Sequence, residues 1–229
     1  TKLFMFSSPC NPTGAVYTKE ELAALAGVFK NHPDVYIMSD EIYEYINYVG
    51  KHESIAQFDE IKDRVVIING LSKGFAMTGY RLGYIAGAPE IVKACEKIQG
   101  QITSGANAVT QRAAITALTS DLSSSKAMVK EFEQRRNVIL ELLKDIPGVC
   151  CYEPDGAFYV FPDVSSYFGK SDGTTTVNNS DELCFYILEK AHVTTVTGKA
   201  FGEDKCIRIA YTNSLPKIRE GMQRIKDAL

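Results

Sequence analysis

The chain has 229 residues, of which 45% are hydrophobic and 23% charged, and its formal net charge at pH 7 is −3. This composition is typical of a globular protein with one large domain or two modest ones. It excludes the clustered basic surface of a nucleic-acid-binding domain, and no apolar run is long enough to span a bilayer. We therefore expect neither nucleic acid nor a membrane among its partners.

The cysteines and histidines show no metal-binding or catalytic spacing. The six cysteines are scattered, without a C-x-x-C pair or a Cys/His cluster at zinc spacing, and none of the three histidines lies in a triad-like or H-E-x-x-H setting. We expect His32, His52 and His192 to be surface or packing residues. The pattern favours reduced thiols in a cytoplasmic protein that binds no metal.

The first part of the chain alternates apolar strands with one helix. Thr18 and Glu21 match a capping box, which predicts a helix from Thr18 to about Lys30 that ends before Pro33. The runs around Val35 and Val65 are apolar without alternation, as expected for strands that are buried on both faces. Strands are predicted over the segments KLFMFSSP, VYIMSDEIY, RVVIING and YRLGYIAG. This order indicates an α/β layered sheet whose functional residues lie at the carboxyl ends of the strands.

The rest of the chain is helical at first and then mixed. Helices are predicted over about 89–99, 107–120, 122–145, 181–191 and 215–228, and strands over GAFYVFPDV, VTTVTG and KCIRIAYT. The polar segment GKSDGTTTVNNS is predicted to be a mobile surface loop. We expect a large domain over 1–121, a bridging helix over 122–146 and a small α+β domain over 147–229.

Four segments carry candidate functional residues at predicted strand ends. Each residue alone has an ordinary structural explanation: a lysine is usually solvated, an aspartate usually caps a turn, and N-P-T-G forms a good turn. Their order and spacing together are specific. The residues are Asn11 in SSPCNPTG, Asp40 and Tyr43 in SDEIY, Lys73 and Arg81 in NGLSKGFAMTGYRLGY, and Arg208 in KCIRIAYTNS.

This pattern resembles the fold-type-I enzymes that use pyridoxal 5'-phosphate (PLP), in particular the class I/II aminotransferases related to aspartate aminotransferase. The resemblance covers essentially all 229 residues, and the run S-K-x-F-x-x-x-G-x-R-x-G around Lys73 is its most specific part. It implies an α/β fold with part of a large, mostly parallel-sheet domain and an α+β C-terminal domain. It also implies a cytoplasmic enzyme of amino-acid metabolism that exchanges an amino group between an amino acid and a 2-oxo acid.

The resemblance implies a role for each residue of the pattern. Lys73 would form a Schiff base with PLP and then act as general base and acid. Asp40 would pair with the protonated pyridine nitrogen, so that the ring accepts electrons from the substrate. The other four residues would bind ligand groups. Asn11 and Tyr43 would hydrogen-bond the cofactor's 3′ oxygen, and Arg81 would pair with the phosphate. Arg208 would clamp the substrate α-carboxylate, and Asn11 is also a candidate substrate-binding residue.

The chain differs from the family it resembles at two places, and one further segment has two interpretations. Gly70 stands where many relatives of this kind carry a hydroxyl that touches the phosphate, so that contact is not expected here. Thr197-Gly198 replaces a Pro-Gly pair, for which we expect only a local difference in the turn. Phe158 and Tyr159 lie in GAFYVFPDV. We interpret this segment first as a core strand, and a contact of these two side chains with the substrate is the alternative.

The chain opens on Thr1 within an apolar strand, and we expect it to be part of a longer protein. In the family it resembles, the N-terminal part supplies further strands, a phosphate-binding loop and the aromatic residue that stacks on the cofactor. We therefore expect the chain alone to be unable to transaminate. The resemblance also implies a homodimer, for which GQITSGANAVTQ is a candidate interface segment.

Two other functions remain open. The same residues would serve a β-lyase, because the cofactor performs the electronic work and the pocket selects which bond breaks. The chain is also compatible with a truncated, non-catalytic module that has kept the fold.

Overall fold

The computed structural model describes residues 1–229, and the chain divides into two compact units. Unit 1 comprises Thr1–Cys10 and Ala15–Val129, and unit 2 comprises Asn11–Gly14 and Lys130–Leu229. Helix α4 (Ser123–Lys144) contributes residues to both units. No helix combines the length and the hydrophobicity needed to cross a membrane.

Unit 1 contains a four-stranded sheet in the order β1-β2-β3-β4. Strands β1, β2 and β3 are parallel, and β4 runs antiparallel to β3. The predicted mostly parallel α/β sheet is therefore confirmed. The strands are β1 (Leu3–Ser7), β2 (Tyr36–Asp40), β3 (Val65–Gly70) and β4 (Gly83–Ala86).

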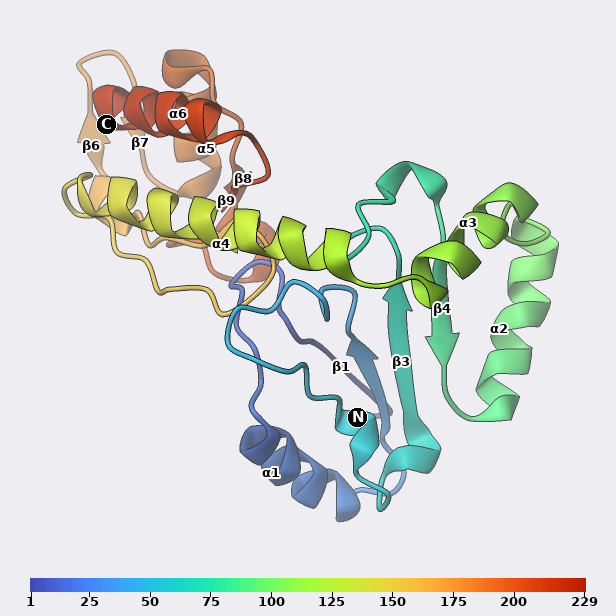
Figure 1. Cartoon of the computed structure of the whole chain (residues 1–229). Coiled ribbons are helices and arrows are strands. Elements are labelled where there is room, and N and C mark those ends of the chain that lie inside the picture. Colours follow the sequence, from blue (N-terminus) through green and yellow to red (C-terminus); the bar gives the residue numbers. More distant parts are fainter. The chain divides into compact units, whose positions relative to one another are not determined.

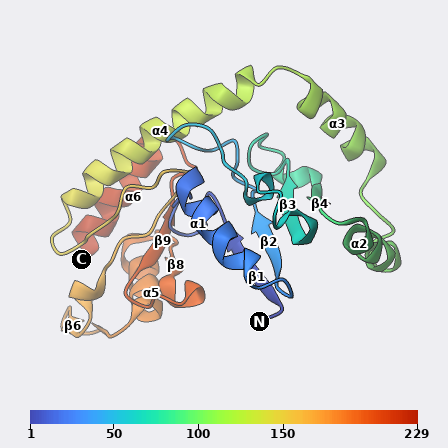
Figure 2. The same cartoon turned by 90° about the horizontal axis from the view of Figure 1, so that it is seen from below.

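Helix α1 (Lys19–Lys30) begins at the predicted capping box. Thr18 Oγ1 accepts a hydrogen bond from Glu21 N, and Glu21 Oε2 accepts one from Thr18 N at 2.8 Å. These bonds satisfy two backbone donors that a helix start leaves unpaired. The buried face of α1 packs on one side of the sheet, where it joins the core with Ile37 and Val65 (Figure 2).

The expectation that the apolar strands are buried on both faces is confirmed for β3 and wrong for β2. Val65, Val66, Asn69 and Gly70 of β3 are buried, whereas Tyr36 at the start of β2 is 44% exposed. A run of apolar residues shows that burial is possible, but the elements that pack on each face decide whether it occurs.

Two further helices of unit 1 leave apolar side chains exposed. Helix α2 (Pro89–Ile102) follows β4 and has no buried residue, and Ile102 at its end is 73% exposed. In helix α3 (Ala108–Thr119), Val109 is 74% exposed. Both helices match their predicted positions, but they contribute little to the core.

Unit 2 is an α+β unit, as predicted. Its main sheet has the order β5-β9-β8 and is antiparallel. Figure 1 shows α5 and α6 side by side in this unit, and both bury apolar residues. These elements are β5 (Tyr159–Val160), α5 (Ser180–Ala191), β8 (Val196–Thr197), β9 (Ile207–Ala210) and α6 (Leu215–Ala228).

The segment 169–180, predicted as a mobile loop, contains a two-stranded hairpin of β6 (Lys170–Ser171) and β7 (Thr176–Val177). Asp172 organises its turn by accepting hydrogen bonds from the backbone of Thr174 and Thr175, which hold the pKa of its carboxyl below the usual range. The polar composition indicated a turn but not the pairing around it. Short 3₁₀ helices complete the fold: Ile55–Gln57, Lys62–Arg64, Thr78–Tyr80, Ser165–Tyr167 and Gly198–Phe201.

Candidate active site

Asp40 is the last residue of β2, at the carboxyl end of the parallel part of the sheet. Its Oδ1 accepts a hydrogen bond from Ile42 N at 3.1 Å, and its carbonyl accepts one from Ser8 N at 3.1 Å. The next residue, Glu41, donates its backbone N–H to Ile68 O at 2.8 Å. Neighbouring strands on both sides therefore hold the backbone that carries Asp40.

Tyr43 and Lys73 approach each other although they follow different strands. Tyr43 lies in the turn after β2 and is 4% exposed. Lys73 lies in the turn after β3, and its Nζ is 5.8 Å from the centroid of the Tyr43 ring. The carboxyl ends of β2 and β3 thus bring an amine, a phenol and the Asp40 carboxylate to one edge of the sheet.

Two glycines allow the close packing around Lys73. A Cβ at Gly74 would lie 2.5 Å from Cδ2 of Tyr45, so the tyrosine ring occupies the space of a side chain. A Cβ at Gly70 would lie 2.9 Å from Leu82 O, because β4 approaches β3 closely there. This approach explains the glycine at position 70.

Arg81 has a left-handed backbone with a φ of 55°, and Ala76 in the same segment has a φ of 53°. Such conformations cost about 1–3 kcal/mol in residues other than glycine and often occur at functional sites. The Arg81 side chain is exposed, and its Nη1 donates to Thr78 O at 3.0 Å. The structure therefore places Arg81 on the lysine-bearing segment, with its guanidinium bonded within its own turn.

In unit 2, Arg208 of β9 contacts Asn11. The Arg208 Nη1 donates to Asn11 Oδ1 at 2.8 Å. The guanidinium carbon lies 4.6 Å from the centroid of the Tyr159 ring and 5.1 Å from that of Phe201. Two aromatic rings and an amide thus hold the guanidinium in place, and Tyr159 is a buried core residue, as predicted.

The Arg208 Nε is buried and has no hydrogen-bond partner. A buried unpaired donor on a charged group is costly, whereas a planar carboxylate matches the guanidinium fork. Arg208 therefore suits an anionic ligand such as a carboxylate.

The turn N-P-T-G fixes the position of Asn11 within unit 2. The Gly14 carbonyl accepts hydrogen bonds from Asp155 N at 3.0 Å and from Gly156 N at 2.8 Å. A Cβ at Gly14 would lie 2.3 Å from Cβ of Pro154, and the φ of +72° also favours glycine. The glycine of this motif therefore serves close packing as well as turning the chain.

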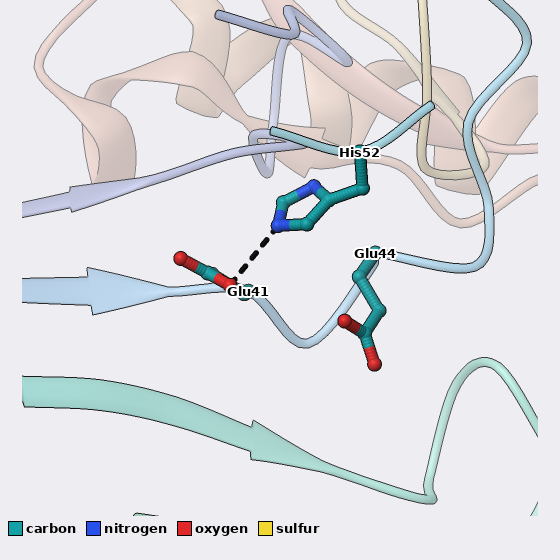
Figure 3. Close-up of side chains that lie close together, drawn as sticks. All are labelled: Glu41, Glu44 and His52. Atoms are coloured by element: carbon teal, nitrogen blue, oxygen red, sulfur yellow. Dashed lines mark hydrogen bonds and ion pairs between the residues drawn. The ribbon is translucent and has the colours of Figure 1, made fainter. Parts of the chain in front are cut away.

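The sequence reasoning missed a polar cluster of Glu41, Glu44 and His52 in unit 1 (Figure 3). His52 Nε2 lies 3.0 Å from Glu41 Oε2, and these side chains are 13% and 5% exposed, respectively. His52 is thus largely buried and paired, which agrees with the packing role expected for it. Only the adjacency of Glu41 to Asp40 in SDEIY pointed to this cluster.

A family model described as aminotransferase class I and II matches residues 1–225. A bifunctional aspartate aminotransferase and glutamate/aspartate-prephenate aminotransferase from Petunia hybrida is 46% identical over 100% of this chain and 49% of its own length. An aspartate aminotransferase from Bacillus subtilis is 42% identical over 99% of the chain and 57% of its own length. The chain thus spans about half the length of these relatives.

The fold agrees with that match. The crystal structure of an aspartate aminotransferase from Rhizobium meliloti superposes with a TM-score of 0.94 and 35% identity, over 99% of this chain and 57% of that one. The family model and the fold therefore agree on one assignment: the chain belongs to the class I and II aminotransferase family, with part of a fold-type-I domain.

Proposed function

We propose that the protein containing this chain is a PLP-dependent aminotransferase in which Lys73 carries the cofactor. The observation that supports this most directly is the arrangement of Asp40, Tyr43 and Lys73 at the carboxyl ends of two adjacent parallel strands. An amine, a carboxylate and a phenol at one sheet edge form a donor set that fits the aldehyde, the pyridine nitrogen and the ring oxygen of PLP.

Bound PLP would supply the electron sink that makes the Cα–H bond of an amino acid acidic. Lys73 would hold the cofactor through its amine and would serve as the base and acid for the proton at the substrate Cα. Asp40 keeps a proton on the pyridine nitrogen, because its carboxylate stabilises the positive charge there. Tyr43 hydrogen-bonds the 3′ oxygen, and Arg81 binds the phosphate.

Arg208 binds the substrate α-carboxylate, and Asn11 orients the guanidinium and shares in binding the ligand. The buried, unpaired Nε of Arg208 supports this role, since a bound carboxylate would satisfy it. Holding the substrate at its carboxylate orients the Cα–H bond for proton removal.

Absorbance spectroscopy and turnover of the complete natural polypeptide test the proposal. With PLP, the wild-type protein should show a visible cofactor band that changes when an amino acid is added. Lys73→Ala should lose this band and the turnover, and Lys30→Ala, at an exposed position on α1, should keep both. A cofactor band that is unchanged in Lys73→Ala would refute the assignment, and release of pyruvate and ammonia in place of transamination would assign lyase chemistry.

We further infer that aspartate is an amino donor, with a 2-oxo acid as acceptor, because the similar proteins from Petunia hybrida and Bacillus subtilis carry that activity in their names. A panel of amino donors with one acceptor tests this inference. Aspartate should give the largest kcat/KM, and a clear preference for an aromatic or branched-chain donor would contradict it.

We also propose a homodimer and assign part of its interface to the segment 100–111. Ile102 and Val109 in this segment are 73% and 74% exposed, and apolar side chains of this kind favour association. Light scattering should give twice the chain mass for the complete protein and a lower mass for Ile102→Asp. Val28→Asp on α1, another exposed apolar position, is the matched control.

We propose a cytoplasmic location for the protein. All six cysteines are unpaired, and burial raises the pKa of Cys151 and Cys206 to about 11, so these thiols stay protonated at neutral pH. Unpaired thiols favour a reducing compartment, which cell fractionation can test.

We propose a large domain over 1–121, a bridging helix over 122–146 and a small domain over 147–229, which limited proteolysis can test.

A further inference from the structure

A buried carboxylate lies directly beside Asp40. Glu41 is 4% exposed, and its Oε1 accepts hydrogen bonds from Ser39 Oγ at 3.0 Å and from Ser54 Oγ at 2.7 Å. Its Oε2 lies 3.0 Å from His52 Nε2, and Figure 3 shows the ring of His52 directed toward Glu41. A buried charge is tolerated only when it is paired in this way.

The cluster is an internal polar network and not a metal site. Ligand atoms of Glu41, Glu44 and His52 lie within 4.8 Å of one another, but both oxygens of Glu41 already accept hydrogen bonds. Glu44 hydrogen-bonds Asn69 and Tyr45. A cation could bind here only if these hydrogen bonds were broken. The cluster is therefore better explained as a hydrogen-bonded network than as a cation site.

The bonds of Glu41 tie the end of β2 to a distant segment. Ser54 is 13 residues away and caps the short helix Ile55–Gln57. His52 has its Nδ1 buried without a partner, so its hydrogen bond to Glu41 is the one that orients the ring. The Glu41 carboxylate thus links His52 and Ser54 to the residue that directly follows β2.

Strand geometry relates this network to Asp40. Successive side chains along a strand point to opposite faces, so Ser39 and Glu41 share one face and Asp40 points to the other. Fixing the Glu41 side chain therefore also fixes the backbone from which the Asp40 carboxylate projects. The bond from Ile42 N to Asp40 Oδ1 at 3.1 Å then restrains the carboxylate itself.

We propose that Glu41 is a positioning residue, which, together with His52 and Ser54, holds Asp40 in the orientation that meets the protonated pyridine nitrogen. This inference rests on the function proposed above. Removing the Glu41 charge would let the end of β2 shift, and a small misplacement of a catalytic group lowers kcat by on the order of tenfold to a hundredfold.

The test uses the complete polypeptide loaded with PLP that is ¹⁵N-labelled at the pyridine nitrogen, because the ¹⁵N chemical shift reports protonation of that nitrogen. Glu41→Gln should move the shift toward that of Asp40→Asn and lower kcat, while KM for the amino donor changes less than twofold, roughly, because Arg208 is untouched. Ser54→Ala, which keeps every charge, should give a smaller change in the same direction. Glu60→Gln, at an exposed carboxylate, should match the wild type.

The proposal is overturned if Glu41→Gln or Ser54→Ala folds and binds PLP with a wild-type ¹⁵N shift and kcat. It is also overturned if Glu41→Gln lowers the melting temperature while the shift and kcat per folded molecule stay unchanged, since the role would then be structural only. If Glu41→Gln does not fold, the ¹⁵N shift and kcat of Ser54→Ala alone test the proposal. If the wild type does not bind PLP through Lys73, the proposed function is refuted and the role of Glu41 is not at issue. If the wild type binds PLP, the ¹⁵N shift of Asp40→Asn is the reference against which the Glu41 and Ser54 variants are compared.

Discussion

Arg208 combines a fixed orientation with an unfilled hydrogen-bonding group. The rings of Tyr159 and Phe201 lie against the guanidinium, and Asn11 Oδ1 accepts a hydrogen bond from its Nη1. The Nε of Arg208 has no hydrogen-bond partner. We predict that Arg208→Lys raises the KM for amino acid substrates about tenfold to a hundredfold, because a bond to a charged group contributes about 1.5–3 kcal/mol and an ammonium cannot form the fork. Steady-state kinetics measure this change.

The matched control is Arg219→Lys, an exposed arginine on α6, which should leave KM unchanged. Equal kinetics of the two variants would exclude Arg208 from substrate binding. A loss of kcat with unchanged KM in Arg208→Lys would also contradict the role, because it would indicate that the residue acts in the transition state alone.

Burial raises the pKa of Glu44 above its ordinary value of 4.5, while nearby His52 and the hydrogen bond to Asn69 act in the opposite direction. The unfolded chain therefore loses this proton at a lower pH than the folded chain. The stability that the neutral carboxyl contributes is full below pH 4.5 and is lost as the pH rises through the raised pKa. Glu41, also close by, adds to the upward shift.

We predict that Glu44→Gln, which keeps an acceptor for Asn69, makes the protein more stable than the wild type at neutral pH and equally stable near pH 4. Urea unfolding at several pH values measures the difference in the free energy of unfolding. A difference that is constant with pH would show that Glu44 has an unshifted pKa. Glu60→Gln, an exposed carboxylate, should show no such pH-dependent gain.

At the scale of elements, the turn after β3 depends on the absence of a side chain at Gly74, where the Tyr45 ring packs against the backbone. We predict that Gly74→Ala lowers the free energy of unfolding by about 1–3 kcal/mol, because a crowded interior must shift to admit the methyl group. It should also weaken PLP binding, since Lys73 is the preceding residue. Urea denaturation and cofactor titration measure the two effects.

Gly79→Ala serves as control, because a Cβ at Gly79 meets nothing within 4 Å. Replacing Tyr45 by a smaller residue should partly restore the stability of Gly74→Ala. If both glycine variants unfold at the same urea concentration, packing against Tyr45 does not determine the residue at position 74.

Elements whose signals are local in the sequence could be predicted. The Thr18–Glu21 capping box and the apolar runs around Val65 gave α1 and β3 nearly to the residue. The hairpin in 169–180 and the Glu41–His52 pair could not, because they depend on which segments meet after folding. The contact between Asn11 and Arg208 spans 197 residues, and the resemblance gave both residues but not the bond between them.

At the scale of the whole molecule, the 229-residue chain exposes apolar side chains in unit 1. Met5 on the edge strand β1 is 65% exposed, and Ile98 on α2 is 60% exposed. Unpaired strand edges and apolar patches favour association with other chains. We predict that these 229 residues, produced alone, self-associate as their concentration rises and do not transaminate.

Light scattering and a turnover assay beside the complete natural polypeptide test this prediction. Met5→Lys and Ile98→Lys together should reduce the association, because charge on an edge strand and on an apolar helix face opposes it. Val28→Lys, at a position on α1 that is 55% exposed, should not. A monomer at high concentration with full turnover would contradict the prediction and would show that Lys73 and Arg208 need no further residues to act.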